Sequence, residues 1–391
     1  MAKNFTAAID IGTQSIRMGL AEDLIQAEIL LPKMAVRTKT ASEGMRQGCV
    51  VEKNEIINSI KKAKLEAEKK INSRIKNALI SIGGTGVSGI NGSGEIVVSK
   101  ADLEITDLDL EKITSICEEN IPSQSILNRK IIHTIPLGYK LDGKVVVGSP
   151  LGMRGTKLEM RCLFVTVLEK HLDDLVGAVE EAGIEVIEIV ASPIASSLVL
   201  LSKQQKKAGC LLADIGSETV SLTVYENNIP VSIEVLPTGS NHITNDIALG
   251  LKISLEEAEH IKRGGLTTTN YPRKKLEEIV EARLSDIFDM IENHLKKINR
   301  SGLLPAGIIF SGSGSNIHNI EELAKEHLKL PAKIGSIPPT SSKNNPTDPE
   351  WSVVDGLCLL GLNTIENERP IGDMIRKTKY KTKKFFKQFL P

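Results

Sequence analysis

Two stretches of the chain, about 200 residues apart, share one pattern of apolar and polar positions. In residues 6–20 an apolar run ends in Asp10-Ile-Gly12, and apolar side chains then alternate with other residues. In residues 209–225 the same order recurs around Asp214-Ile-Gly216. Each pattern predicts a strand, a tight polar turn and a second strand. The repeat indicates a duplicated α/β fold with two lobes.

The turn of the first predicted hairpin is suited to binding phosphate. Gly12 lets backbone N–H groups approach an anion, and the hydroxyls of Thr13 and Ser15 add donors. An aspartate at the end of a buried strand costs free energy unless a partner satisfies it, and hydrated Mg²⁺ is such a partner. We therefore expect Asp10 and Asp214, on facing hairpins, to hold one Mg²⁺–phosphate group between the lobes.

Between and after the hairpins, the apolar spacing predicts alternating helices and strands. The expected helices cover 52–70, 106–119, 171–182, 239–251, 255–262, 273–299, 317–327 and 351–362. The expected strands cover 78–82, 95–98, 131–139, 145–147, 160–167, 184–190 and 306–310. Glycines at 89–94 predict a turn, and 363–370 predicts a linker. Gly83-Gly84 either turns the chain into an inserted subdomain or forms a further phosphate loop.

Composition limits the class of protein. A chain of 391 residues with 41% hydrophobic and 25% charged residues predicts a globular protein of two or more domains. The five cysteines have no paired spacing, which favours buried thiols in a reducing compartment over metal or redox chemistry. The chain shows neither an N-terminal signal peptide nor an apolar run of about 18 residues, so we expect no transmembrane helix.

The net charge of zero conceals a basic C-terminal segment. Residues 376–387 carry seven Lys and Arg and no acid, which leaves 42 basic against 49 acidic residues elsewhere. A basic body, typical of nucleic-acid binding, is therefore not expected. Apolar and basic residues of this segment separate onto two faces at helical spacing, among them Ile375, Lys383, Lys384, Phe385, Phe386, Phe389 and Leu390. This pattern predicts a helix lying in an anionic membrane surface; a disordered basic end or a nucleic-acid contact are the alternatives.

The order of these features resembles the ATPase superfamily of actin, sugar kinases and heat-shock chaperones. Within it, the chain resembles the FtsA family of bacterial cell-division proteins over essentially its whole length. The most particular marks are Gly152-Met-Arg-Gly-Thr-Lys-Leu-Glu159, Glu257-Ala-Glu-His-Ile-Lys262 and the basic, aromatic C-terminal end.

The resemblance implies an ATP site with Mg²⁺ between the lobes. Its expected residues are Asp10, Gly12, Thr13, Gln14, Ser15, Asp214, Gly216, Ser217, Glu218, Thr219, Gly239, Glu259, Lys262, Gly312, Ser313 and Gly314, with Asp10 and Asp214 at the metal. Ser217 and Glu218 depart from the family pattern, which continues with further glycines. A glutamate beside a phosphate adds like-charge repulsion unless it holds Mg²⁺ through water, so we expect altered or weak nucleotide binding and at most a weak ATPase.

The resemblance also implies the domain organisation. The first lobe is expected to comprise 1–84, 164–190 and 351–370, and an inserted subdomain for filament contacts to comprise 85–163. The second lobe is expected at 191–240 and 300–350, with a helical subdomain at 241–299 for nucleotide and FtsZ-tail binding. The linker end and membrane helix follow at 371–391.

The implied function is a filament on the cytoplasmic face of the membrane, at the division site, that anchors FtsZ. Arg283, supported by Arg273, Lys274 and Lys275, is the expected contact for the FtsZ C-terminal tail. Other division proteins and further copies of the chain are implied partners, and nucleic acid is not. The alternatives are an actin-like platform protein of type IV pilus assembly and a small-molecule kinase of the same superfamily. A chaperone ATPase is disfavoured because too few residues follow Pro370 for a peptide-binding domain.

Overall fold

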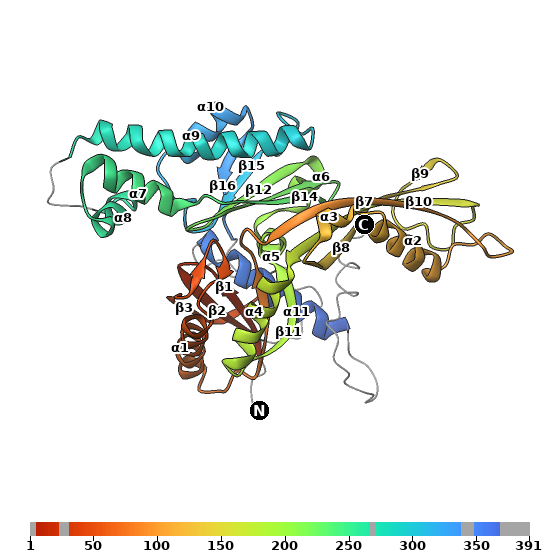
Figure 1. Cartoon of the computed structure of the whole chain (residues 1–391), viewed down its shortest axis with the longest axis horizontal. Helices are drawn as coiled ribbons and strands as arrows, with labels where there is room; N and C mark the ends of the chain where they lie inside the picture. Colours follow the sequence, from red (N-terminus) through yellow and green to blue (C-terminus); the bar gives the residue numbers. More distant parts are fainter. Residues whose placement is uncertain (1–4, 23–30, 266–270, 338–347, 368–391) are drawn as a thin grey trace.

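The computed structural model describes residues 5–22, 31–265, 271–337 and 348–367. Figure 1 shows two lobes stacked on one another and an arm that projects to one side. Each part is built on its own sheet, two of five strands and one of four. The predicted membrane helix at 371–391 lies outside the described residues. Among those described, no helix has the length and apolarity needed to cross a bilayer.

The sheet of the first lobe runs in the order β11-β6-β1-β2-β3. Its strands are β1 (Phe5–Ile11), β2 (Ser15–Glu22), β3 (Met34–Ala41), β6 (Asn77–Ile82) and β11 (Glu185–Ala191). The first three form an antiparallel meander, and the last two add in parallel. Helix α1 (Lys53–Ile71) packs on β2 and β3 and beside α4 (Glu169–Glu181), whereas α11 (Ser352–Asn367) packs on β1, β2 and β6 and beside α5 (Ser192–Leu200).

The second lobe repeats this topology. Its sheet runs β14-β13-β12-β15-β16, with an antiparallel meander followed by two parallel strands. These strands are β12 (Cys210–Ile215), β13 (Val220–Glu226), β14 (Ile229–Leu236), β15 (Ile308–Ser311) and β16 (Ala332–Ile334). Its helices are α6 (Lys203–Ala208), α7 (Ser240–Leu251), α8 (Leu255–Lys262), α9 (Arg273–Lys297) and α10 (Ile320–Leu328). The matching strand order confirms the duplicated, two-lobed α/β fold.

The projecting arm contains β7 (Val87–Val97), β8 (Arg129–Leu141), β9 (Lys144–Val146), β10 (Lys157–Leu168), α2 (Asp107–Glu119) and α3 (Ser123–Ile126). The turn predicted at residues 89–94 is wrong, because all six residues lie within β7. The glycines serve packing: a Cβ on Gly92 would lie 2.6 Å from the carbonyl oxygen of Cys117 in α2. Small residues here let the helix backbone approach the strand.

Two further features bear on the site. The short strands β4 (Met45–Arg46) and β5 (Cys49–Val50) form a tight hairpin, and the 3₁₀ turn η1 (Pro349–Trp351) leads directly into α11. The predicted linker at 363–370 is corrected in part, because α11 continues to Asn367. The cores are aliphatic, and all five cysteines are free thiols, four of them buried.

Candidate functional site

A cavity of about 100 Å³ lies between the turns of the two repeated hairpins. From the expected ATP-site residues it brings together Asp10, Gly12, Thr13, Gln14, Ser15, Asp214, Gly216, Ser217, Thr219, Gly312 and Ser313. Glu218, Gly239, Glu259, Lys262 and Gly314 do not line it. The two lobes therefore contribute to one site, as duplicated hairpins facing each other allow.

The two hairpin turns have matching backbone geometry. The N–H of Gly12 donates to the carbonyl oxygen of Ser15 at 3.1 Å, and the N–H of Gly216 donates to that of Thr219 at 2.8 Å. In each lobe the aspartate is the second-to-last residue of its strand, so its carboxylate lies beside the turn. The arrangement presents two similar, acid-flanked loops to a shared space.

Asp10 is held from two directions. It is 8% exposed, and Ser81 Oγ donates to its Oδ1 at 2.7 Å. Its Oδ2 lies 3.3 Å from Nη1 of Arg17, the residue directly opposite it in the β1–β2 register. A buried carboxylate with a cationic partner and a hydroxyl donor is satisfied and fixed in orientation.

Asp214 sits in a less compensated environment. Burial raises its pKa to about 6, the nearby Asp10 charge adds to the rise, and Arg17 opposes it. Gly312 packs directly against this carboxylate: its φ is +80°, and a Cβ there would lie 2.3 Å from Asp214 Oδ1. Gly312 is therefore required both by its backbone conformation and by the position of Asp214.

The carboxylate of Glu218 was expected to face the phosphate, but it contacts the other lobe instead. Its Oε2 accepts a 2.6 Å hydrogen bond from the backbone N–H of Gln47, in the tight β4–β5 turn of the first lobe. The next N–H in that turn, from Gly48, donates to Thr13 Oγ1 at 2.9 Å. The departure from the family pattern thus forms a bridge between the lobes, because this turn contacts both loops.

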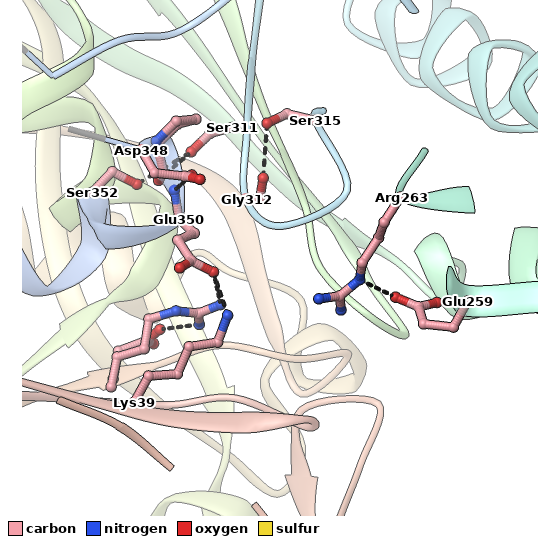
Figure 2. Close-up of polar contacts among 12 residues, drawn as sticks. Lys39, Glu259, Arg263, Ser311, Gly312, Ser315, Asp348, Glu350 and Ser352 are labelled. Atoms are coloured by element: carbon pink, nitrogen blue, oxygen red, sulfur yellow. Dashed lines mark hydrogen bonds and ion pairs between the residues drawn. The ribbon is translucent and has the colours of Figure 1, made fainter. Parts of the chain in front are cut away.

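Two expected ATP-site residues that do not line the cavity, Glu259 and Lys262, lie on α8. Lys262 Nζ is 2.6 Å from Glu259 Oε2, which also accepts from Thr244 Oγ1 at 2.6 Å. Lys262 further donates to the carbonyl oxygen of Ser240, in the first turn of α7. Figure 2 shows Arg263 paired with Glu259; its Nε lies 2.7 Å from Glu259 Oε1.

Gly239 and Gly314 support the loops from behind. A Cβ on Gly239 would lie 2.6 Å from the carbonyl oxygen of Ser217. One on Gly314 would lie 3.0 Å from Cβ of Ser240, which begins α7. These glycines position the second loop against α7 and the turn after β15 instead of lining the cavity.

Several lining residues were missed from the sequence. Prominent among them are Arg17, Gly48, Ser192 and Glu350, together with Gly83-Gly84, which sequence left as either a turn or a phosphate loop. The hairpin register offered a signal for Arg17, since a residue seven positions after Asp10 falls opposite it. Glu350 lies 333 residues after Arg17 in the chain, so no local sequence pattern could place it at the site.

The expected FtsZ-tail residues lie on α9. Arg283 is already paired: its Nε and Nη2 lie 2.6 and 3.1 Å from the carboxylate oxygens of Asp246 on α7. Arg273 and Lys274 pair with glutamates one turn further along the same helix, whereas Lys275 has no ion pair among the described residues. The side chains of Arg273, Lys274 and Lys275 are exposed at the start of α9.

Comparisons with known proteins agree with this architecture. A model of "Cell division protein FtsA" matches residues 211–356, and a model of the "SHS2 domain inserted in FTSA" matches residues 84–166. Relatives named cell division protein FtsA include that of Pseudomonas aeruginosa, 28% identical over 90% of this chain and 88% of its own. That of Borreliella burgdorferi is 27% identical over 92% and 91%.

Solved structures show the same fold at low identity. The PilM-PilN type IV pilus biogenesis complex matches with a TM-score of 0.68 and 17% identity, over 92% of this chain and 99% of the other. MreB5 of Spiroplasma citri bound to ADP matches with a TM-score of 0.53 and 14% identity, over 94% and 100%. The duplicated lobes and these matches show that the chain has an actin-like fold. The chain belongs to the FtsA family of cell division proteins. The family models and these relatives favour this assignment over the pilus-platform alternative.

Proposed function

We propose that this cell division protein binds Mg-ATP between its lobes, assembles into filaments on the cytoplasmic face of the membrane and anchors FtsZ there. The observation that carries the nucleotide part is the pair Asp10 and Asp214 on facing loops of one cavity. Actin-like neighbours support it, since MreB5 structures are described as bound to ADP and to AMPPNP. ATP then sets lobe closure, and closure sets the contacts between filament subunits.

The cavity has the size and chemistry of a phosphate site. Pockets that take whole drug-sized ligands measure roughly 300–1,000 Å³, whereas this one measures about 100 Å³. We therefore place the phosphates in the cavity and the nucleoside outside it, toward Gly312 and the Glu259–Lys262 pair. Arg17 lines the cavity and supplies a buried cation near the first loop. We assign Arg17 to the phosphate site with Thr13 and Ser15.

The residues present also fit magnesium. Mg²⁺ uses one or two protein carboxylates and completes its shell with water and phosphate oxygens. Asp10 and Asp214 are the carboxylates that would hold it, and the described residues contain no group of three or more potential metal ligands. Magnesium held by these two acids would neutralise phosphate charge beside them. Asp214, whose pKa is raised to about 6, is the acid that gains most from that neutralisation. We expect at most weak ATP hydrolysis.

Helix α9 is our proposed docking site for the FtsZ C-terminal tail. Arg273, Lys274 and Lys275 form an exposed basic start to this helix. Arg283 lies about two and a half turns further on, and its bidentate pairing with Asp246 shows that its guanidinium is oriented to bind a carboxylate. A tail carboxylate would compete with Asp246 for Arg283.

Membrane attachment and filament formation complete the proposal. The C-terminal segment 371–391, with its apolar and lysine-rich faces, is the proposed membrane helix. The projecting arm at 85–163 is the proposed filament contact. Its exposed apolar residues include Val145 and Val147, at 75% and 94% exposure, which suits a surface that another subunit covers.

Electron microscopy of the full chain on lipid monolayers tests this proposal. With anionic lipid and Mg-ATP we expect ordered filaments, and fewer or differently spaced filaments without nucleotide. A monolayer of neutral lipid is the matched control for the basic segment. Protein that coats anionic lipid without filaments under either nucleotide condition would exclude the polymer, and protein that ignores the lipid would exclude the membrane helix.

A further inference from the structure

Arg17 links the two lobes through two carboxylates. Arg17 is 9% exposed; its Nη1 lies 3.3 Å from Asp10 Oδ2, and its Nη2 lies 3.4 Å from Glu350 Oε2. Asp10 belongs to the first loop, whereas Glu350 belongs to η1, which follows the sheet of the second lobe. The buried guanidinium of Arg17 therefore pairs both with Asp10 in the first loop and with Glu350 in the segment that connects the lobes.

Glu350 has a second partner in the first lobe. Its Oε2 accepts a 2.6 Å hydrogen bond from Lys39 Nζ on β3, and Figure 2 shows the two side chains pointing toward each other. Burial alone would raise the pKa of Glu350, but Lys39 and Arg17 outweigh burial and lower it, so the carboxylate is ionised. Lys39 can neutralise this charge if Arg17 is engaged elsewhere.

The segment that carries Glu350 is also held by the second lobe. Ser311 Oγ, at the end of β15, donates to the carbonyl oxygen of Pro349 at 3.3 Å and lies 3.2 Å from Ser352 Oγ. Ser352 is the first residue of α11. Hydroxyls therefore fix this segment to one lobe, while the Glu350 carboxylate fixes it to the other (Figure 2).

The guanidinium of Arg17 borders the first loop and retains a free donor. Its Nη1 lies 4.0 Å from the position that a Cβ on Gly12 would occupy. Its Nε is buried and has no hydrogen-bond partner among the described residues. An acceptor that entered beside Gly12, such as a phosphate oxygen, would meet both this guanidinium and the negative charge of Glu350, which lines the same cavity.

We propose that Glu350 is an internal counter-anion that holds Arg17 until a phosphate group displaces it. When phosphate displaces the Glu350 carboxylate from Arg17, the carboxylate stays paired with Lys39. The turn η1 then loses its ion pair with the buried Arg17. The start of α11 is then less constrained, while the rest of that helix remains fixed by the Arg37–Asp355 pair, whose Nη2 and Oδ2 lie 2.6 Å apart. Phosphate occupancy is thereby communicated to the last described helix, which leads to the C-terminal segment.

This inference rests on the proposed nucleotide site, so its test separates the two. Glu350→Gln keeps the side-chain shape and removes the charge. In the full chain we expect it to bind Mg-ATP about five- to tenfold more tightly than the wild type by isothermal titration calorimetry. Lys39→Gln leaves Arg17 as the only cation paired with Glu350 among the described residues, so we expect two- to fivefold weaker binding. Glu180→Gln, an exposed acid outside the site, is the matched control and should change nothing.

Hydrogen exchange supplies a readout independent of affinity. Amides of residues 350–354 should exchange faster in the wild type after Mg-ATP is added, and should already exchange faster in Glu350→Gln without nucleotide. Equal or weaker Mg-ATP binding by folded Glu350→Gln, or exchange in 350–354 that does not respond to Mg-ATP in the wild type, would overturn the inference. A wild type that binds no Mg-ATP contradicts the proposed nucleotide site itself.

Discussion

The carboxylate of Glu218 and the backbone N–H of Gln47 join the two lobes through a 2.6 Å hydrogen bond. The adjacent N–H, from Gly48, donates to Thr13 in the first loop. One tight turn therefore contacts the loops of both lobes. Glu218 in the second loop therefore makes a contact between the lobes.

Replacing Glu218 should loosen the two lobes. A hydrogen bond to a charged group contributes about 1.5–3 kcal/mol, and one to a neutral group about half as much. We expect Glu218→Ala to lower the free energy of unfolding by about 2 kcal/mol and Glu218→Gln, which keeps an acceptor, by about 1 kcal/mol. Urea unfolding at pH 7.5 measures both. If neither variant differs from the wild type, the bond does not stabilise the folded state.

Asp10 should be required for stabilisation by Mg-ATP. A ligand at 100 times its Kd stabilises a protein by about 2.7 kcal/mol, so thermal unfolding of the wild type should shift upward by several degrees with Mg-ATP and less with ATP plus EDTA. Asp10→Asn removes the carboxylate charge and should abolish the difference. Ser81→Ala removes only the hydroxyl that donates to Asp10 and should retain most of it. An undiminished magnesium-dependent shift in Asp10→Asn would exclude Asp10 from the metal site.

His133 should make the fold acid-sensitive. It is 2% exposed, its Nε2 accepts from the N–H of Ala191 at 3.1 Å, and burial lowers its pKa to about 3. Between pH 6.5 and about 3 the unfolded chain binds a proton at this residue that the folded chain does not, so stability falls as the pH falls. The loss approaches 1.36 kcal/mol per pH unit, or about 2 kcal/mol at pH 5.

The measurement is urea unfolding of wild type and His133→Gln at pH 7.5, 6 and 5. In the variant, the free energy of unfolding should change less steeply with pH, by an amount that corresponds to about one proton fewer taken up on unfolding. Asp214 acts in the opposite direction, because its raised pKa of about 6 makes the folded state take up a proton first. Repeating the comparison in an Asp214→Asn background removes that offset. Identical slopes with and without His133 would refute its role.

Arg283 and Asp246 provide a paired test of the FtsZ-tail site. Arg283→Glu should weaken binding of a fluorescent FtsZ tail peptide by tenfold or more, measured by anisotropy. Asp246→Asn removes the bidentate partner of Arg283, which keeps only its 3.2 Å contact with Asp286, and should strengthen binding a few-fold. Lys296→Glu, on the same helix but at its far end, is the control for added negative charge. Unchanged affinity in both Arg283→Glu and Asp246→Asn would place the peptide elsewhere.

The C-terminal segment should carry membrane binding. Removing residues 374–391 deletes all seven basic residues of 376–387 and the terminal aromatic cluster. Each basic residue near an anionic surface contributes about 1 kcal/mol and each buried Phe about 1.5–3 kcal/mol. Co-sedimentation with anionic liposomes should therefore be lost. Substituting Phe385, Phe386 and Phe389 by serine keeps the charge and distinguishes insertion from electrostatic adsorption. Pelleting that survives the truncation would disprove this assignment.

Sequence patterns located most elements because local periodicity reports burial directly. The two hairpins, the long helix α9 and the strands β8, β9 and β10 of the arm lie close to their expected ranges. The predictions were wrong where one residue type occurs in two kinds of structure. Glycines at 89–94 were assigned to a turn, but in β7 they let α2 approach closely. The segment after residue 362 was assigned to a linker, yet α11 continues to Asn367.

The residues of the site also divide into those that sequence patterns located and those that only the structure revealed. The repeated Asp-Ile-Gly pattern was enough to pair Asp10 with Asp214, because duplicated hairpins in a two-lobed fold must face each other. Sequence alone therefore determined the fold, the family resemblance and the acidic loops of the site. Tertiary structure decided that Glu218 reaches Gln47 and that Glu350 reaches Arg17. Both contacts join residues far apart in the chain, and their geometry depends on how the lobes are placed, which no local pattern of polarity encodes.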